Sequence, residues 1–354
     1  MHHQYMQRCL DLAKNGLGHV APNPMVGCVI VYNDQIIGQG YHQEYGKAHA
    51  EVNAINSVKD KSLLKSARLY VNLEPCAHFG KTPPCSDLIL EHQIPEVIIG
   101  CQDSFSLVSG NGINKLIKAG VNVISGVKEK ECRELNKRFF TFHEKKRPYI
   151  ILKWAQTLDG FIDKKREGAM PTSINWVSNK YAKILVHQWR SQEQGIMIGT
   201  NTAINDNPQL NVRLVSGQNP TRIILDKTLK LTSQLNILDG SNSTLVFTQI
   251  ENTFPTIKNT EFIGINFSAN VLAQILNILF QKNIQSVIVE GGGVLLNTFL
   301  ENKLWDEARV IIGNTTFGSG LEAPIINLKS QSIEELGDNK LIVYRNDIEV
   351  TDLV

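Results

Sequence analysis

The sequence lacks several features that mark whole classes of protein. No uninterrupted apolar stretch approaches the length of about 20 residues needed to cross a bilayer. No cysteine follows Cys132, whereas a secreted disulfide framework would staple both halves of the chain. A net charge of +2 and an aromatic content of 7% argue against a broad nucleic-acid or anionic-membrane surface. We therefore expect a cytoplasmic protein that binds neither membranes nor nucleic acid.

What the sequence does contain is typical of an ordinary globular protein. Hydrophobic residues make up 42% of the chain and charged residues 20%, which is enough apolar material for a large core. The first segment, "MHHQYMQRCLDLAKNG", lacks the continuous apolar centre of a signal peptide and instead predicts an amphipathic helix. With 354 residues, the chain is long enough for two domains.

The first part of the chain alternates strand-like and helix-like segments. This alternation predicts a three-layer α/β domain. The expected helices lie near 3–15, from about 49 and near 85–92, the strands over 26–32, 35–41, 67–73 and 96–101, and a helix–strand–helix follows to about Phe142. The charged run "HEKKRP" (143–148) indicates a boundary, although it could equally be a solvated helix end. We accordingly place one domain over 1–145 and a second over 146–354.

The second part repeats the alternation with its own set of strands. Expected strands cover 149–155, 195–199, 222–226, 244–247, 286–290 and 308–313, and expected helices lie near 178–190, over 269–282 and after the "GGG" at 291–293. The pattern predicts a second α/β domain with a separate sheet.

Four residues of the first part suggest a metal centre. His49 and Glu51 stand two apart at a predicted helix start, and Cys76 and Cys85 follow a strand. One imidazole and two thiolates favour zinc and leave a fourth position open for water, whose pKa zinc brings toward neutrality. Glu51, which need not bind the metal, can then carry protons. Cys85 is expected to open a helix whose dipole favours a thiolate.

Other interpretations of these residues stay open at this level. Each residue alone is more often an ordinary helix or core residue, so the inference depends on the combination. His78 is a rival third ligand, disfavoured because a ligand two residues from Cys76 would strain the chelate. The zinc-deaminase signature H-x-E…P-C-x-x-C fits except that position 79 is Phe and the second cysteine is Cys85.

Longer motifs make the assignment specific. "YMQRCLDLAKNG", "PNPMVGCVIV", "HAE" and "EPCAHFGKTPPC" together resemble the deaminase half of the bifunctional riboflavin-biosynthesis deaminase–reductase family, which carries this long Cys–Cys loop. The resemblance implies a cytidine-deaminase-like fold, with His49, Cys76 and Cys85 as zinc ligands and Glu51 as the proton shuttle. It also makes Asn23 and Lys81 substrate contacts. Taken alone, Asn23 could be a turn residue between prolines and Lys81 a solvated loop charge.

One segment departs from the family. Where the family shows "DPNP.V.G.G", this chain has "DSFSLVSGNG" (103–112). Asp103, Gly110 and Gly112 match the family pattern, but the Asn-Pro pair is missing and Asn111 replaces a basic residue. We expect this difference to affect a substrate contact rather than the zinc chemistry.

A glycine turn marks the second domain. "SVIVEGGGVLLNTFL" (286–300) predicts a strand, a glycine turn and a helix, an arrangement that lets backbone N–H groups approach a phosphate. It is not the GxGxxG fingerprint, and such a turn is often only a tight connection. Together with "LKWAQTLDG" and "WRSQEQGIMIGTNTAINDNPQLNVR", however, it resembles the reductase half of the same family, which is similar in fold to dihydrofolate reductase.

The resemblance assigns residues of the second domain to two ligands. The implied NADPH contacts are Ala155, Trp176, Thr202, Asp206, Gly292, Gly293, Val294, Leu295, Leu296, Asn297 and Thr298, and the implied substrate contacts are Arg190, Leu210, Arg213 and Glu290. Two arginines suit a sugar phosphate, although either could be a surface charge. The family's Ser before the Trp falls on Ile174, with Ser173 as the alternative. Asp206 and Glu290 are the possible proton donors, and a purely positional role is equally open.

The whole pattern implies one substrate acted on twice. That substrate is 2,5-diamino-6-ribosylamino-4(3H)-pyrimidinone 5′-phosphate, which the first domain would deaminate with Zn²⁺ and the second would reduce with NADPH at the ribosyl group. The resemblance also suggests a homo-oligomer. Two rivals are a nucleic-acid base deaminase carrying an RNA-binding domain, and a non-catalytic protein that has kept the fold.

Overall fold

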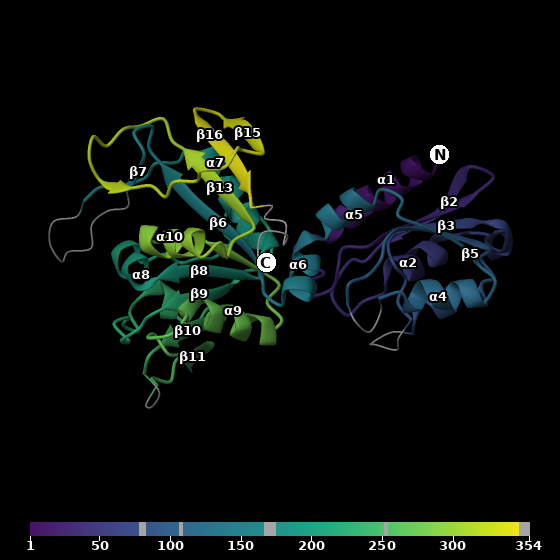
Figure 1. Ribbon diagram of the computed structural model, residues 1–354, viewed down its shortest axis with the longest axis horizontal. Helices are drawn as coiled ribbons and strands as arrows, with labels where there is room; N and C mark the ends of the chain where they lie inside the picture. The colour runs from purple at the N-terminus through teal and green to yellow at the C-terminus, as the bar shows by residue number, and fades with distance from the viewer. Residues whose placement is uncertain (78–82, 106–108, 166–174, 251–253, 347–354) are drawn as a thin grey trace, which may run out of the picture. The chain divides into compact units, whose positions relative to one another are not determined.

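The computed structural model describes residues 1–77, 83–105, 109–165, 175–250 and 254–346. The chain divides into two compact units, Met1–Lys146 and Arg147–Val354, each with its own sheet (Figure 1). The boundary predicted after residue 145 lies one residue from this division. Among the helices of the described residues, none combines the length and the apolar character that crossing a membrane requires.

The first unit is built on a five-stranded mixed sheet of order β2-β1-β3-β4-β5. The strand β1 pairs antiparallel with β2 and β3, and the β3–β4 and β4–β5 pairs are parallel. Asn33 and Asp34 form the two-residue turn between β1 and β2, both with positive φ, as such hairpins require. The strands are β1 (Gly27–Tyr32), β2 (Gln35–Tyr41), β3 (Arg68–Leu73), β4 (Glu96–Cys101) and β5 (Asn122–Ser125).

Helices cover both faces of this sheet, which confirms the predicted three-layer fold (Figure 1). One face packs against α2 (Ala50–Ser57), α3 (Cys85–Glu91) and α4 (Asn111–Lys118) through residues such as Ala54, Ile89 and Leu116. The other face packs against α1 (His2–Ala13), α5 (Glu129–Leu135) and α6 (Lys137–Lys145) through Met6, Cys9 and Cys132. The helix predicted near 3–15 is α1 followed by the 3₁₀ turn η1 (Lys14–Gly16), and a second 3₁₀ turn, η2, covers Lys61–Ser66.

The second unit has a nine-stranded sheet of order β11-β10-β9-β8-β12-β6-β13-β16-β15. The strands from β11 to β13 are parallel and the β16–β15 hairpin is antiparallel, closing one edge. The central strands are continuous apolar runs, as strands covered on both faces should be. The strands of this sheet are β6 (Tyr149–Gln156), β8 (Gly195–Gly199), β9 (Thr221–Leu225), β10 (Thr244–Thr248), β11 (Thr260–Gly264), β12 (Ser286–Val289), β13 (Glu307–Ile312), β15 (Ser332–Leu336) and β16 (Asn339–Arg345).

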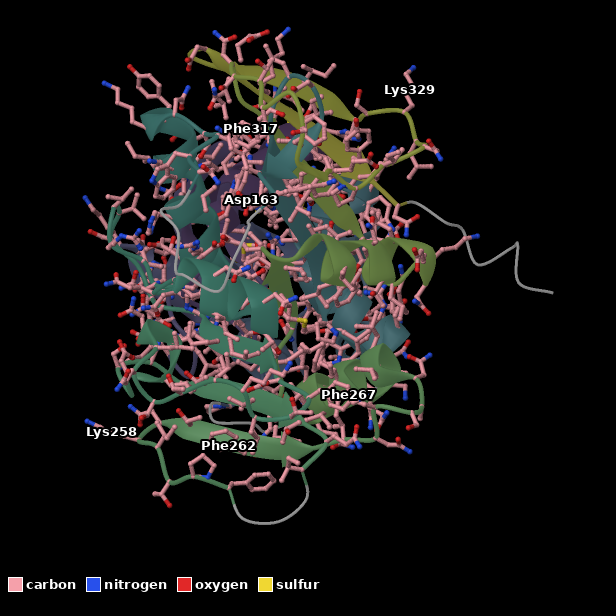
Figure 2. The ribbon with its side chains drawn as sticks, turned by 90° about the vertical axis from the view of Figure 1, so that its left-hand side faces the viewer. Asp163, Lys258, Phe262, Phe267, Phe317 and Lys329 are labelled. Atoms are coloured by element: carbon pink, nitrogen blue, oxygen red, sulfur yellow. The ribbon has the colours of Figure 1, made fainter. Side chains whose placement is uncertain are left out.

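Two helices cover each face of the second sheet. The pair α9 (Val271–Gln281) and α10 (Gly293–Glu301) packs on one face, and the pair α7 (Lys180–Gln192) and α8 (Thr200–Asp206) on the other, near the 3₁₀ turn η3 (Asn236–Leu238). A small ribbon joins β7 (Phe161–Asp163) to β14 (Leu321–Glu322). In Figure 2, Phe262 of β11 lies at one end of this unit and Asp163 of the ribbon lies toward the other. The parallel order brings the carboxyl ends of β6, β8 and β12 to one edge, where ligands of such sheets bind.

Candidate active sites

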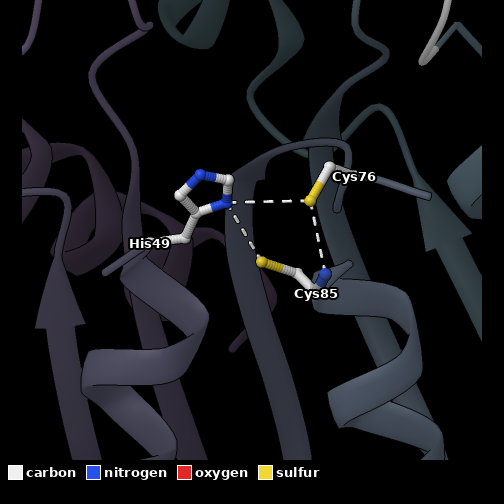
Figure 3. Close-up of side chains that lie close together, drawn as sticks. All are labelled: His49, Cys76 and Cys85. Atoms are coloured by element: carbon white, nitrogen blue, oxygen red, sulfur yellow. Dashed lines mark hydrogen bonds between the residues drawn. The ribbon is translucent and has the colours of Figure 1, made fainter. Parts of the chain in front are cut away.

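Three potential metal ligands of the first unit lie together (Figure 3). His49 precedes the first residue of α2, Cys76 follows β3, and Cys85 is the first residue of α3. Their ligand atoms all lie within 4.8 Å of one another. The Nδ1 atom of His49 is 3.2 Å from Sγ of Cys85 and 3.7 Å from Sγ of Cys76.

This donor set fits zinc. A tetrahedral zinc with ordinary Zn–N and Zn–S bonds separates its nitrogen and sulfur ligands by about 3.5 Å. The two observed nitrogen–sulfur distances, 3.2 and 3.7 Å, lie on either side of that value. Two thiolates and one imidazole also match the preference of zinc over harder ions. The three side chains can therefore hold zinc and leave a fourth position for water.

Cys85 opens the helix α3, as expected, and the start of that helix also contacts Cys76. The backbone N–H of Cys85, at the start of α3, donates to Sγ of Cys76 over 3.3 Å. Hydrogen bonding from Cys85, together with His49, lowers the pKa of the Cys76 thiol. The hydrogen bond to Cys76, together with burial, raises the pKa of the Cys85 thiol. The backbone N–H of Cys85 at the helix start thus stabilises negative charge on Cys76.

Glu51 lies beside these three residues, in the helix α2 that His49 precedes. It is the second residue of α2, and only 3% of it is exposed. Burial raises the pKa of its carboxyl above the ordinary value, opposed by His49 and reinforced by Cys76. A carboxyl group whose pKa is raised toward neutrality can both accept and release protons, as a general acid–base requires.

Asn23 is held by a histidine that the motifs did not single out. The ring of His42, 2% exposed, has Nδ1 3.0 Å from the carbonyl oxygen of Ala48 and Nε2 3.1 Å from Nδ2 of Asn23. A carbonyl only accepts, so Nδ1 carries the proton and Nε2 accepts from the Asn23 amide. Burial lowers the pKa of His42, which favours this neutral form. The amide oxygen of Asn23 is thereby oriented.

Two residues named from the sequence lie outside the described residues of this site. They are Lys81 and the rival ligand His78. In the atypical segment 103–112, Asp103 is 7% exposed, and burial raises its pKa to about 7. Gly110 has a φ of +75° and Gly112 starts the buried side of α4. The glycines that match the family thus serve the entry into this helix.

In the second unit, a buried carboxylate lies at the sheet edge. Glu290 directly follows β12, whose residue Val289 pairs with Leu152 on one side and Met197 on the other. The two Glu290 oxygens accept from Nε and Nη2 of Arg190 at 2.8 and 2.7 Å, and Lys153 Nζ is 3.6 Å away. Burial alone would raise the pKa of Glu290, but Arg190 and Lys153 outweigh it and bring the pKa to about 2. Glu290 is therefore ionised at neutral pH.

The glycine turn lies directly against Thr202 of α8. A Cβ atom on Gly291 would be 2.7 Å from Cγ2 of Thr202, so a side chain there would force a shift. Gly292 precedes α10 with a φ of +80°, a conformation that L-residues rarely adopt. In α10, Val294 is 82% exposed, whereas Leu295 and Leu296 are buried in the core. The two leucines can therefore offer a ligand only their backbone N–H groups, which a helix start presents.

Positive groups gather beside Glu290. The backbone N–H of Arg213 donates to Nδ1 of His187 over 3.2 Å, and Nη1 of Arg190 donates to the carbonyl oxygen of Asn211. Burial, together with the charges of Arg190 and Arg213, lowers the pKa of His187 to about 4. The Arg213 side chain is exposed, and the pKa of Lys183 is lowered by burial and by Arg213. This cluster can attract an anion such as a phosphate.

The remaining residues named from the sequence lie around this edge. Trp176 is 58% exposed, and the ammonium of Lys183 lies 3.4 Å from its ring centroid. Leu210 is buried with a φ of +49°, which is rare for a branched residue and marks a constrained backbone. Ala155 is near the end of β6, and Asp206 ends α8. Ser173 and Ile174 lie outside the described residues.

Sequence reasoning missed some of these groups. Lys153 had a local signal, because a charged residue interrupts the apolar strand "YIILKWA". His42, His187 and Lys183 had none, because their partners come from other elements.

Comparisons with known proteins point the same way as this geometry. The family model described as "Cytidine and deoxycytidylate deaminase zinc-binding region" matches residues 1–101, and the one described as "RibD C-terminal domain" matches residues 148–349. The "Riboflavin biosynthesis protein RibD" of Aquifex aeolicus is 38% identical over 353 residues, covering 96% of this chain and 97% of that protein. The corresponding protein of Bacillus amyloliquefaciens is 38% identical over 367 residues, covering 98% and 97%.

Two solved structures are similar over nearly the whole chain. The diaminohydroxyphosphoribosylaminopyrimidine deaminase/5-amino-6-(5-phosphoribosylamino)uracil reductase of Thermotoga maritima has a TM-score of 0.86 and 36% identity, covering 97% of this chain and 98% of that one. Acinetobacter baumannii RibD has a TM-score of 0.86 and 31% identity, with the same coverage. The predicted fold class is thereby confirmed in both units.

Proposed function

The chain belongs to the RibD family of riboflavin-biosynthesis proteins, and from that premise we propose which residues carry out its two reactions. The protein is a zinc-dependent deaminase and an NADPH-dependent reductase. We assign the deaminase to residues 1–145 and the reductase to 146–354. Its substrate is 2,5-diamino-6-ribosylamino-4(3H)-pyrimidinone 5′-phosphate, the compound class that the Thermotoga maritima relative is named for.

In the first domain, His49, Cys76 and Cys85 hold zinc. When bound, the metal supplies a nucleophile at neutral pH by lowering the pKa of a coordinated water. Glu51 would take one proton from the attacking water and pass it to the ring nitrogen, and would then take the second proton from the new hydroxyl and pass it to the departing amine. The balance is one water consumed, one ammonia released and a C=O group in place of C–NH₂. Asn23, oriented by His42, and Lys81 hold the pyrimidine and its substituents.

In the second domain, NADPH would supply a hydride to C1′ of the ribosyl group in its ring-opened imine form, and a proton taken up by the imine nitrogen would complete the reduction. The protein binds and orients the two partners and excludes water. The cofactor contacts are Ala155, Trp176, Thr202, Asp206 and the turn and helix start from Gly292 to Thr298. Arg213 has an exposed guanidinium for the substrate phosphate, whereas Arg190 is engaged with Glu290 and acts mainly by fixing that carboxylate. Leu210 and Glu290 complete the substrate site.

The observation that carries the deaminase assignment is the His49–Cys76–Cys85 cluster with a buried Glu51 beside it. Each of these side chains has ordinary uses alone, but a soft donor set with one open position and a protonatable carboxyl is what hydrolytic deamination needs. The reductase assignment is supported by the glycine turn against Thr202 and by the positive cluster near Glu290.

Paired assays on the wild type and Glu51→Ala test the proposal. Each protein receives either the diaminopyrimidinone substrate or its deaminated form, and ammonia release and NADPH oxidation are followed separately. We expect Glu51→Ala to lose deamination by about 10²–10⁴-fold, the usual contribution of a general acid–base, while it still oxidises NADPH with the deaminated substrate. Glu91→Ala, which removes an exposed carboxylate at the end of α3, is the matched control.

Each contrary result has a distinct meaning. Wild type that releases ammonia but never oxidises NADPH would contradict the reductase assignment. If the wild type neither releases ammonia nor oxidises NADPH despite bound zinc, the substrate assignment is contradicted. That result would favour a nucleic-acid deaminase, whose RNA binding should depend steeply on salt.

We also propose that the protein acts in the cytoplasm as a homo-oligomer. The cytoplasmic location is supported by the six free thiols, which a reducing compartment preserves. The oligomer is tested by light scattering during size exclusion, where a mass of 39.6 kDa would contradict it.

A further inference from the structure

The carboxylate of Glu74 is buried between the metal ligands and a neighbouring helix. Glu74 lies between the end of β3 and Cys76, and only 4% of it is exposed. Each of its oxygens accepts two backbone N–H groups. Oε2 accepts from Asp103 at 3.2 Å and Gly110 at 3.0 Å, and Oε1 accepts from Gly112 at 2.9 Å and Ile113 at 3.2 Å.

Three of these donors, Gly110, Gly112 and Ile113, belong to the entry and first turn of α4, and the fourth, Asp103, follows β4. Gly110 precedes that helix and has no side chain with which to cap it. The N–H groups that a helix start leaves without partners are therefore satisfied by a carboxylate from 36 to 39 residues earlier in the chain. A cap from within the loop would stabilise the helix equally well. The use of Glu74 instead connects α4 to the segment that carries Cys76, because Glu74 lies only two positions before that ligand.

A second contact, independent of charge, joins the same two segments. A Cβ atom on Gly112 would lie 1.9 Å from the carbonyl oxygen of Pro75, far inside the 3.0 Å that real contacts respect. The first turn of α4 therefore packs directly on the peptide between Pro75 and Cys76. Only glycine allows this approach. The backbone before Cys76 is thus held by a four-fold hydrogen bond on one side and by close packing on the other.

We propose that Glu74 and Gly112 are positioning residues of the metal centre, which set the place of Cys76 Sγ relative to His49 and Cys85. The inference builds on the proposed deaminase function but names residues that act through a ligand. The tie matters because a metal ligand that shifts changes both affinity and reactivity, and partners of ligands typically contribute 10–100-fold to one or the other. The atypical segment after β4 is held by the same carboxylate through Asp103.

Glu74→Gln is the main test. Glutamine keeps the size, but it offers one acceptor oxygen and turns an NH₂ group toward N–H donors. The proteins are loaded with Co²⁺, whose visible and thiolate charge-transfer bands report ligand geometry. We expect altered bands and a deamination kcat lower by about 10–100-fold, with KM for the substrate little changed. NADPH oxidation with the deaminated substrate should equal that of the wild type.

Matched variants separate positioning from folding. Glu96→Gln alters a carboxylate at the start of β4 that accepts from Asn122, and it should leave the Co²⁺ spectrum unchanged. Glu74→Asp keeps the charge and should recover part of the lost kcat. Gly112→Ala should change the Co²⁺ spectrum in the same direction as Glu74→Gln, and it serves as the test if Glu74→Gln does not fold.

The outcomes distinguish the positioning role of Glu74 from the proposed deaminase function on which it rests. A Co²⁺ spectrum and a kcat equal to those of the wild type in Glu74→Gln would overturn the positioning role, even if that variant melts at a lower temperature. Wild type that shows thiolate–Co²⁺ bands but releases no ammonia would count against the proposed reaction. The spectra alone would then decide the inference, and identical bands in Glu74→Gln and wild type would refute it.

Discussion

At the residue scale, the proposed reductase site depends on one buried carboxylate. Glu290 neutralises Arg190 and Lys153, and its side chain is 6% exposed. Removing the charge by Glu290→Gln leaves two buried cations without their counter-charge, so we expect the free energy of unfolding to fall by about 3–5 kcal/mol. Urea unfolding followed by fluorescence measures this loss. Glu261→Gln, which breaks the exposed pair with Lys282, is the control and should cost less than about 1 kcal/mol.

The same carboxylate predicts a pH dependence. The pKa of Glu290 is about 2 in the folded protein, against an ordinary value of 4.5. Between these values the unfolded chain binds more protons, so the stabilisation from Glu290 is complete above about pH 4.5 and is lost as the pH falls toward 2. We expect the difference in unfolding free energy between wild type and Glu290→Gln to be constant at neutral pH and to shrink below pH 4.5. A difference that shrinks already near pH 6, by the same urea measurements, would contradict this.

Sequence reasoning reached some residues of the sites and not others, for a physical reason. His49 precedes a helix, Cys76 follows a strand and Cys85 begins a helix, and these element ends meet at one edge of the sheet. The order of helices and strands can be predicted along the chain, so the convergence of the three side chains could be predicted too. His42 and His187 act through partners on other elements, so their neighbours in the sequence carry no sign of it. The hydrogen bond from the start of α3 to Cys76 could not be predicted, because the direction of an N–H group is a property of the folded backbone.

At the element scale, the buried parallel strands were predictable and the edges were not. Largely apolar runs marked the strands that became β6, β8 and β12. The edge strands β11, "TEFIG", and β15, "SIEEL", were missed because they are short, charged and partly exposed, and β16, which pairs with β15, was missed with them. A usable signal existed, since Leu336 pairs with Asn339 across a two-residue turn that starts at Gly337 with a φ of +69°. The helix α8 was missed because its seven residues carry little periodicity.

The glycine turn before α10 yields a prediction at this scale. Gly292 has a φ of +80°, so Gly292→Ala should cost about 1–2 kcal/mol in backbone strain and move the first turn of α10. Because that turn is proposed to hold NADPH, we expect the Kd for NADPH to rise by about tenfold, which corresponds to about 1.4 kcal/mol. Quenching of protein fluorescence by NADPH measures the Kd.

A second glycine provides the comparison. Gly199 precedes α8 with an ordinary φ of −93°, and a Cβ atom there would meet nothing within 4 Å. Gly199→Ala should therefore leave the melting temperature nearly unchanged. Equal NADPH affinity in Gly292→Ala and wild type would place the cofactor phosphates elsewhere on the sheet edge.

At the scale of the whole molecule, two chemistries share one chain but not one set of residues. The three proposed metal ligands lie in Met1–Lys146, and the glycine turn and the Glu290 cluster lie in Arg147–Val354. The order of two alternating patterns made this division predictable from the sequence. Subunit assembly was not predictable from the chain in the same way, because it depends on how exposed surfaces match between copies.

Metal removal tests the separation of the two sites. Treating the wild type with a chelator should bring ammonia release to background, because the proposed deamination needs the metal that we assign to His49, Cys76 and Cys85. NADPH oxidation with the deaminated substrate should persist, since hydride transfer draws on binding and orientation in the other unit. Adding Zn²⁺ back should restore ammonia release, and chelator already saturated with Zn²⁺ is the control for other effects of the reagent. If NADPH oxidation fell in step with metal content and recovered with it, the reductase would depend on the metal-bound fold of the first unit, and the two sites would have to be treated as one cooperative system.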